Sequence, residues 1–243
     1  MDLNSKIKEF REIVINSDNI VFFGGAGVST ESGIPDFRSK DGLYNQKYKY
    51  PPEAILSHTF FVNETEEFYK FYKDKLNAIS YEPNITHYKL AELEKEGKLK
   101  AAVTQNIDGL HQKAGSQNVY ELHGSVYRNY CTRCKEFYGP EYIFNDDTPV
   151  VPICTKCGGV IKPDVVLYEE ALDDEVVSGA INAISTADTL IVGGTSLTVY
   201  PASGLVRYFR GKNLVLINKD ETPYDNMATL VIHESLGNVF KNL

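Results

Sequence analysis

The chain has 243 residues, of which 42% are hydrophobic, and its 25 basic and 33 acidic side chains give a net charge of −8. This length and composition exclude a disordered protein and allow one substantial core, alone or with a smaller satellite module. The acidic balance argues against a nucleic-acid-binding protein, which needs a basic face to bind phosphates, and favours small molecules or basic peptides as ligands.

The first predicted element is a helix over residues 3–14, where apolar side chains recur at helical spacing. Basic side chains at Lys6, Lys8 and Arg11 interrupt this only early apolar run, so the segment predicts neither a signal peptide nor a membrane span. We therefore expect a cytoplasmic protein without a membrane partner, and we expect a monomer.

Five short apolar runs predict buried parallel strands. They are residues 20–23, 101–104, 165–167, 189–192 and 214–217, and each follows or precedes a helical segment. Strands that alternate with helices imply an α/β fold with a doubly wound, Rossmann-like parallel sheet.

Two segments depart from this alternation and predict a smaller second domain. Residues 44–79 are aromatic and helical, and residues 131–159 are rich in Cys, Gly, Pro and charge. The predicted Rossmann-like domain comprises residues 1–36, 82–125 and 160–243. Residues 37–81 would form a cofactor loop and helical module, and residues 126–159 a zinc-binding module.

All four cysteines fall into two Cys-x-x-Cys pairs, the pattern of a four-thiolate zinc site. The predicted ligands are Cys131, Cys134, Cys154 and Cys157. Because four protein ligands close the coordination sphere, this zinc ion would stabilise the small domain and would not activate water. Disulfides and a thioredoxin-like redox motif are the alternatives; the missing secretion signal weakens the first, and the paired arrangement weakens the second.

Polar loops follow three of the predicted strands. In residues 24–30, GGAGVST, small side chains let the backbone approach a pyrophosphate at a helix N-terminus. Thr30 stands where the dinucleotide fingerprint has its third glycine, so a simple strand-to-helix turn is an equal alternative. Residues 194–196 and 218–220 follow two later strands, and such loops meet in the crevice where doubly wound sheets bind ligands.

Six features in this order resemble the sirtuin family. They are GAGVSTESGIPDFR (25–38), TQNIDGLH (104–111), ELHGS (121–125), the two Cys-x-x-Cys pairs, GTSLTVYPAS (194–203) and Asn218 after its strand. The resemblance runs from the first strand nearly to the end of the chain. It implies an NAD-dependent protein-lysine deacetylase (deacylase) with one structural zinc ion, whose partners are acylated-lysine proteins or peptides.

The resemblance also implies which residues bind NAD. Around the pyrophosphate, on the loop that closes over the cofactor, and at the nicotinamide ribose, these are Gly25, Ala26, Gly27, Thr30, Asp36, Phe37, Arg38, Gln105, Asn106, Ile107, Asp108 and His123. For the adenosine half they are Thr195, Ser196, Asn218 and Leu236. The nicotinamide carboxamide would be held by Ile107 and Asp108.

His123 matches the family's catalytic histidine, and Asn106 and Asp108 would orient the ribose beside it. In the sirtuin mechanism the acyl-lysine oxygen attacks C1′ of the nicotinamide ribose, nicotinamide leaves, and a base then activates the 2′-hydroxyl to attack the imidate. An imidazole titrates near neutral pH, so it suits this proton transfer. The products would be free lysine, nicotinamide and O-acyl-ADP-ribose.

Two departures from the family pattern concern the substrate. Sirtuins that remove acidic acyl groups carry Tyr-x-x-Arg where this chain has Tyr69 and Tyr72, which we predict to contact the acyl group. The alternative is a helix face packed on a core, which an aromatic run such as residues 68–72 more often forms. Without the arginine, burial of a second carboxylate is costly, so neutral groups such as acetyl should be preferred over succinyl.

The acylated peptide would pair as an added strand along Val165, Val166 and Tyr168. Sirtuins usually have glycine where this chain has Glu169. This side chain, with the acidic residues 173–175, motivates the hypothesis that basic flanking residues are favoured. A solvated helix start is an equal alternative, because acidic residues suit a first helical turn.

Three function classes follow. A deacylase is the first, and a mono-ADP-ribosyltransferase or NAD glycohydrolase on the same scaffold is the second, because both begin with nicotinamide release. A catalytically silent zinc-bearing interaction module is the third, disfavoured by the intact set of His123, Asn106 and Asp108. The other histidines are assigned surface or capping roles: His58, His87, His111 and His233.

Overall fold

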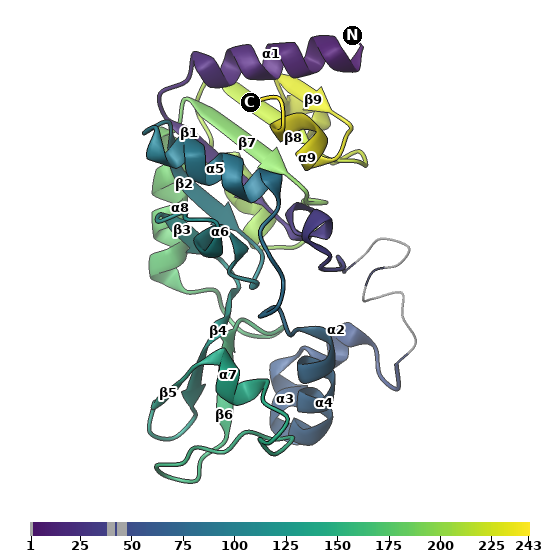
Figure 1. Ribbon diagram of the computed structural model, residues 1–243, viewed down its shortest axis with the longest axis vertical. Helices are drawn as coiled ribbons and strands as arrows, with labels where there is room; N and C mark the ends of the chain where they lie inside the picture. The colour runs from purple at the N-terminus through teal and green to yellow at the C-terminus, as the bar shows by residue number, and fades with distance from the viewer. Residues whose placement is uncertain (1, 38–41, 43–47) are drawn as a thin grey trace.

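A six-stranded parallel sheet forms the larger part of the molecule, in a computed structural model that describes residues 2–37, 42 and 48–243. The strands lie in the order β3-β2-β1-β7-β8-β9 (Figure 1). Their bounds are β1 (Ile20–Gly24), β2 (Leu99–Thr104), β3 (Val119–Glu121), β7 (Thr189–Gly193), β8 (Asn213–Ile217) and β9 (Leu230–Ile232). This is the Rossmann order, and its direction reverses between β1 and β7.

Helices cover both faces of this sheet, because successive side chains of a strand point to opposite faces. Ile20 and Phe22 of β1 pack with α1 (Leu3–Ile15), α5 (Ile85–Lys95) and α9 (Leu236–Phe240). On the other face, Val21 and Phe23 pack with α8 (Asp174–Thr186) and the 3-10 segment Ala202–Tyr208. The predicted doubly wound sheet is therefore confirmed.

A smaller module lies beside the sheet, at the bottom of Figure 1. It holds a three-stranded antiparallel sheet, β5-β4-β6, formed by β4 (Gly124–Cys131), β5 (Phe137–Tyr138) and β6 (Ile161–Val165). Its helices are α2 (Pro52–Ile55), α3 (His58–Asn63), α4 (Thr65–Lys75) and α7 (Pro140–Ile143). Phe68 of α4 shares one core with Val126 and Ile161 of the small sheet, so the two insertions fold as one unit.

One predicted strand is wrong. The apolar run at 165–167 was expected in the large sheet, but the strand there is β6, which ends at Val165 and pairs with β4. Lys162 and Asp164 alternate with buried residues in β6, as in a half-buried antiparallel strand. The predicted domain boundary at residue 160 therefore falls just before a strand of the small sheet.

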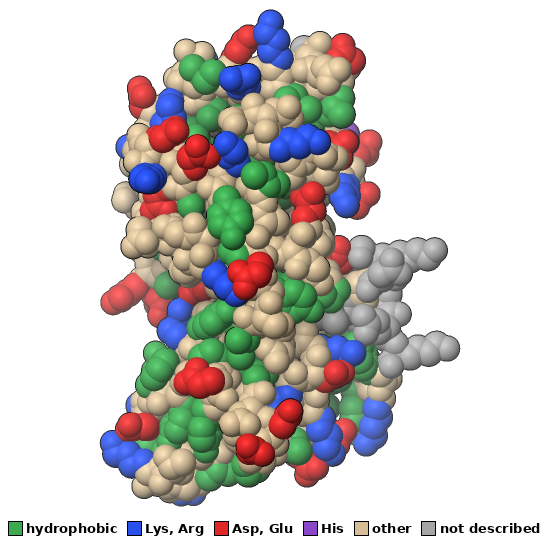
Figure 2. Space-filling view, viewed as in Figure 1, with side chains coloured by type: hydrophobic (Ala, Val, Ile, Leu, Met, Phe, Trp, Pro, Cys, Tyr) green, Lys and Arg blue, Asp and Glu red, His purple; other side chains and the backbone are tan. Residues whose placement is uncertain are grey.

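The molecular surface carries both signs of charge. Figure 2 shows Lys and Arg interspersed with Asp and Glu over the viewed face, without one continuous basic patch. Within the described part of the chain, every helix is too short or too polar to cross a bilayer.

Candidate active site and metal centre

A cavity of about 710 Å³ lies between the carboxyl ends of the parallel strands and the smaller module. The loops after β1, β2, β7 and β8 meet there, as expected where the order of a doubly wound sheet reverses. The predicted NAD-binding residues that line it are Gly25, Ala26, Gly27, Thr30, Asp36, Phe37, Gln105, Asn106, Ile107, Asp108, His123, Thr195, Ser196, Asn218 and Leu236. Arg38, also predicted, lies outside the described residues.

The loop after β1 is packed directly against the loop after β7. Gly27 N donates to Gly194 O at 2.8 Å, and a Cβ on Gly27 would lie 2.7 Å from Gly194 Cα. Gly194 has φ +60°, in the left-handed region that favours glycine. Both positions therefore require glycine, and the small side chains keep the backbone of residues 25–27 accessible at the cavity wall.

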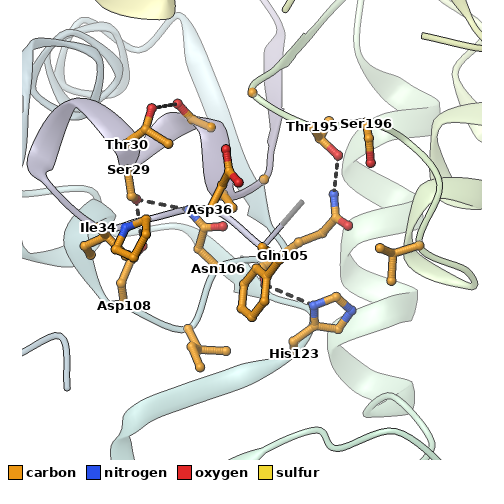
Figure 3. Close-up of a pocket in the computed structure, with 18 of the residues that line it drawn as sticks. Ser29, Thr30, Ile34, Asp36, Gln105, Asn106, Asp108, His123, Thr195 and Ser196 are labelled. Carbon is orange, nitrogen blue, oxygen red and sulfur yellow. Dashed lines mark hydrogen bonds between the residues drawn. The ribbon is translucent and has the colours of Figure 1, made fainter. Parts of the chain in front are cut away.

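Ser29 links the loops after β1 and β2. Its Oγ donates to Asp108 Oδ2 at 2.7 Å and accepts from Asn106 Nδ2 at 3.1 Å (Figure 3). Burial raises the pKa of the Asp108 carboxyl, although hydrogen bonds from Leu110 N and Ser29 oppose the shift. Ser29 lies inside the motif at 25–38 but was not predicted as a site residue, because only its tertiary contacts reveal this role.

His123 lies at the junction between the two sheets, after β3 and directly before β4, and it lines the cavity. Its Nδ1 lies 2.9 Å from Gln105 O (Figure 3). Because a carbonyl oxygen only accepts, Nδ1 carries the proton and Nε2 is the basic nitrogen. Burial lowers the pKa of His123, opposed in part by the hydrogen bond to Gln105, so the ring is neutral at pH 7.

Gln105 also ties this region to the loop after β7. Its Nε2 donates to Thr195 Oγ1 at 3.0 Å, and the same oxygen accepts from Leu197 N at 3.2 Å. Its backbone N donates to Gly24 O at 3.0 Å, at the end of β1. The position of the His123 ring is therefore set by a residue fixed to the centre of the large sheet.

Val165, Val166 and Tyr168, the predicted peptide-binding residues, all line the cavity. Val166 N donates to His123 O at 3.0 Å, which fixes the wall next to the imidazole. Tyr168 N donates to Leu56 O at 2.9 Å, so this segment also contacts the helical module. Leu56 itself lines the cavity and was not predicted.

Tyr69 and Tyr72, predicted to contact the acyl group, are not among the residues that line the cavity. Both side chains are fully buried in the core of the smaller module and neither lines the cavity. Tyr69 Oη donates to Ile161 O, and the Tyr72 ring stacks against Phe68 and Phe144 with centroid distances of 5.6 Å. The face of α4 that carries them turns towards the small sheet, as expected for an aromatic helix face that packs on a core.

Glu169 is exposed at the edge of the cavity. Its backbone has φ +75°, a conformation that favours glycine, and its Oε2 accepts from Thr59 N at 2.9 Å. Hydrogen bonds from Thr59 lower the pKa of the Glu169 carboxyl. Glu169 thus adopts a backbone conformation that favours glycine and carries a negative charge at the cavity edge.

The remaining histidines lie outside the cavity lining. His58 and His233 are exposed, as predicted. His87 belongs to the N-terminal capping box of α5, but it is buried, and its ring packs edge-to-face on His111 with centroids 4.9 Å apart. Burial lowers the pKa of His87 to about 3 and that of His111 to about 4, so both are neutral core residues, and a surface role for His111 is wrong.

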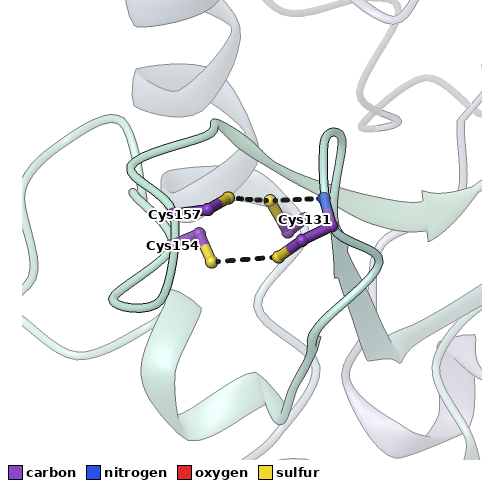
Figure 4. A group of neighbouring side chains, drawn as sticks. Cys131, Cys154 and Cys157 are labelled. Atoms are coloured by element: carbon purple, nitrogen blue, oxygen red, sulfur yellow. Dashed lines mark hydrogen bonds between the residues drawn. The ribbon is translucent and has the colours of Figure 1, made fainter.

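The four cysteines meet at one point of the smaller module (Figure 4). The Sγ atoms of Cys131 and Cys157 are 3.4 Å apart, those of Cys134 and Cys154 are 3.6 Å apart, and all four lie within 4.8 Å of one another. Tetrahedral Zn–S bonds of about 2.3 Å imply S···S distances of about 3.8 Å, so the cluster has the size that zinc requires. Disulfide sulfurs lie about 2.05 Å apart, which these distances exclude.

The backbone around this cluster also suits thiolate ligands. The N–H groups of Arg133 and Cys134 point to Cys131 Sγ at 3.4 and 3.5 Å. A Cβ at Gly159 would lie 2.9 Å from the same sulfur, so glycine leaves the room that the sulfur needs. These residues fit one structural zinc ion held by four sulfurs, with no open position for water.

Comparisons with known proteins identify one family model and several relatives with the same name. The model described as the Sir2 family matches residues 25–201. A protein of Clostridium acetobutylicum named NAD-dependent protein deacetylase is 60% identical over 245 residues, covering 100% of both chains. One of Clostridium perfringens with the same name is 62% identical over 240 residues, covering 98% of each chain.

Solved structures are similar over nearly the whole chain. A structure of Sir2 bound to acetylated peptide has a TM-score of 0.86 at 39% identity and covers 97% of this chain and 95% of its own. One of Sir2 with a p53 peptide and NAD+ has a TM-score of 0.85 at 40% identity, with coverage of 97% and 95%. A third holds a deacetylated p53 peptide and 3′-O-acetyl ADP ribose, with a TM-score of 0.89 at 40% identity and coverage of 97% and 96%.

Proposed function

This chain belongs to the Sir2 family and is an NAD-dependent protein deacetylase, and we propose that His123 is its catalytic base. The main support for this proposal is the hydrogen bond from His123 Nδ1 to Gln105 O at the wall of the cavity. That bond leaves Nε2 as the basic nitrogen, in a ring that burial keeps neutral.

The same cavity is proposed as the NAD site. Residues 25–27 would lie against the pyrophosphate, where the absence of large side chains lets the phosphates approach the backbone. Gly25 N and Gly27 N donate to Gly193 O and Gly194 O, so the N–H group of Ala26 is the one proposed to bind a phosphate oxygen. Thr195, Ser196, Asn218 and Leu236 would serve the adenosine half, since they lie on the loops after β7 and β8 and on α9. NAD supplies the electrophilic C1′ of its nicotinamide ribose and the ADP-ribose that accepts the acyl group.

Asp108 and Asn106 are proposed to orient the nicotinamide ribose and carboxamide. Both side chains share Ser29 Oγ, so neither rotates freely. A fixed pair of polar groups lowers the entropy cost of aligning C1′ with the acyl oxygen. His123 Nε2 would then accept the proton of the ribose 2′-hydroxyl as that oxygen bonds to the imidate carbon. It would return a proton to the lysine nitrogen as the bond from that nitrogen to the carbon breaks, and water would supply the oxygen that completes O-acetyl-ADP-ribose.

The acyl-lysine is proposed to enter along Val165, Val166 and Tyr168. These residues form an apolar wall of the cavity beside the imidazole, called here the channel wall. An apolar wall suits a neutral acyl chain and excludes water. The peptide backbone would add alongside the segment that follows β6.

The second candidate, an ADP-ribosyltransferase or NAD glycohydrolase, shares nicotinamide release but not the dependence on acyl-lysine. Nicotinamide release should therefore be measured with NAD and an acetyl-lysine peptide, the unmodified peptide, or no peptide. A deacetylase releases nicotinamide at a high rate only with the acetylated peptide and forms one O-acetyl-ADP-ribose per nicotinamide. Equal release without acetyl-lysine would support the second candidate.

A reducing compartment is also proposed, in keeping with the expected cytoplasmic location. None of the four cysteines forms a disulfide, and thiolate ligands for zinc require reduced thiols. The monomeric state stays a prediction, which light scattering at several protein concentrations tests.

A further inference from the structure

Strand β4 contains an irregular step beside the cavity. Its pairing with β6 shifts register between Ser125 and Asn129, so residues 126–128 bulge from the ladder. Within this bulge, Val126 N donates to Ile107 O at 3.0 Å. The bulge, which begins three residues after His123, therefore contacts the loop after β2 directly.

Arg128 ends this bulge, and its guanidinium joins two carboxylates from the two sheets. Nη1 donates to Glu121 at 2.6 Å, and Nε donates to Asp164 at 2.7 Å. Glu121 ends β3 and lies two residues before His123, while Asp164 lies in β6 directly before Val165. One side chain thus connects the segment that carries the imidazole to the segment that forms the channel wall.

The two connected segments are also in direct backbone contact. Gly124, directly after His123, has φ +75°, and a Cβ there would collide with Asp164 O. Val166 N donates to His123 O at 3.0 Å. No side chain separates the backbone of Gly124 from that of Asp164. A displacement of residue 164 is therefore transmitted to the backbone of His123.

The Asp164 side chain is 44% exposed, as in a surface ion pair, whereas the Glu121 end of the bridge is buried and differs from such pairs, which contribute little. The Glu121 side chain is only 8% exposed, so its charge is costly to bury without a cation, and the described residues show it bonded to Arg128 alone. The guanidinium presents two nitrogens to two acids in fixed directions, which an ammonium group does not.

We propose that Arg128 is a positioning residue of this deacetylase, whose bridge between Glu121 and Asp164 sets His123 against the channel wall at Val165 and Val166. The proposal deepens the proposed function and rests on the role of His123 as the base. Arg128 acts through these neighbours and does not line the cavity.

Separate rates for nicotinamide release and for deacetylation distinguish a positioning role of Arg128 from a purely structural one. Nicotinamide release needs an aligned acyl oxygen, whereas the later deacetylation step also needs the base. Exchange of labelled nicotinamide into NAD reports the first half, and O-acetyl-ADP-ribose formation reports the complete reaction. A misplaced histidine slows the second readout more than the first.

The test compares Arg128→Met with wild type, with both rates normalised to folded, zinc-loaded protein. We expect the ratio of deacetylation to nicotinamide exchange to fall at least about tenfold, because a shift of about 1 Å in a catalytic group has effects of this size. A parallel fall of both rates, or no change in either, would overturn the proposal.

The double variant Arg128→Met/Glu121→Gln keeps the test decisive if the single variant fails to fold. It lacks the bridge but leaves no unpaired charge buried at position 121, and the same selective loss is expected. Lys70→Met is the matched control, because Lys70 forms exposed ion pairs with Glu66 and Glu67 on α4 and should leave the ratio unchanged.

Failure of this inference and failure of the proposed function give different results. If His123→Ala retains full deacetylation, the assignment of the base is wrong whatever Arg128 does. If His123→Ala loses deacetylation but keeps exchange, while both Arg128 variants match wild type, only the positioning role is wrong.

Discussion

The Nδ1 atom of His123 donates a hydrogen bond to the carbonyl oxygen of Gln105 over 2.9 Å. Gln105 directly follows β2, and its own N–H bonds to Gly24 O at the end of β1. The imidazole is therefore anchored to two central strands of the large sheet, although it lies at the boundary with the smaller module. This anchor fixes which nitrogen is basic, and the predictions on catalysis depend on it.

The first prediction concerns the pH dependence of deacetylation. Burial lowers the pKa of His123 below its ordinary value of 6.5. A base must be unprotonated, so activity is retained above the lowered pKa and lost as pH falls through it. The acidic limb of the kcat/KM profile, which reports the free enzyme, should therefore have an apparent pKa below 6.5, and a limb at or above that value would contradict the assignment.

The second prediction concerns zinc. Cys131 and Cys154 belong to the same core as Phe68 and Ile161, so loss of the metal should loosen the whole smaller module. We expect one zinc ion per chain and a fall in Tm of more than about 10 °C on chelation, reversed by added zinc. An unchanged Tm in metal-free protein would show that the four sulfurs do not need the ion.

The third prediction concerns the acyl group. The channel wall is apolar at Val165 and Val166, and Lys75, a cation on the cavity lining, is already paired with Asp74 at 2.9 Å. Lys219, the other cation among the described lining residues, lies on the loop after β8 with the residues proposed for the adenosine half. A succinyl carboxylate beside Val165 and Val166 would therefore meet no cation on that wall, and kcat/KM should be at least about tenfold lower for succinyl-lysine than for acetyl-lysine peptides. Comparable turnover of the two peptides would contradict this preference.

The fourth prediction concerns residues that flank the acyl-lysine. Glu169 adds an exposed charge at the cavity edge, so peptides with basic flanks should be favoured over those with acidic flanks by up to about fivefold at low salt. Glu169→Gln keeps an acceptor for Thr59 N and should reduce this difference, while the acidic residues 173–175 remain. Equal kcat/KM values for the two peptides with wild-type enzyme at low salt would refute the hypothesis.

Continuous apolar runs in the sequence were enough to predict the buried central strands of the large sheet. The strands β1, β2, β7 and β8 are continuous apolar runs covered on both faces, and all four lie where they were expected. β3 and β9 have only three residues each, too few for a pattern to emerge. The run at 165–167 was assigned to the wrong sheet, because a run of apolar residues does not identify the strand with which it pairs.

Site residues were predictable where they stand in contiguous motifs, and not where tertiary packing decides. Residues 25–27 and 105–108 line the cavity because the ends of parallel strands must meet there. Tyr69 and Tyr72 do not line the cavity, because α4 packs on the small sheet with the face that carries them. Ser29 and Arg128 gain their roles from partners distant in sequence, such as Asp108 and Asp164.

The central claim is tested most directly by the rate at which His123→Ala removes acetyl groups from an acetyl-lysine peptide in the presence of NAD. The variant should bind NAD and still exchange labelled nicotinamide, while its deacetylation rate falls by at least about a hundredfold, the usual contribution of a positioned general base. Deacetylation at the parent rate would contradict the claim.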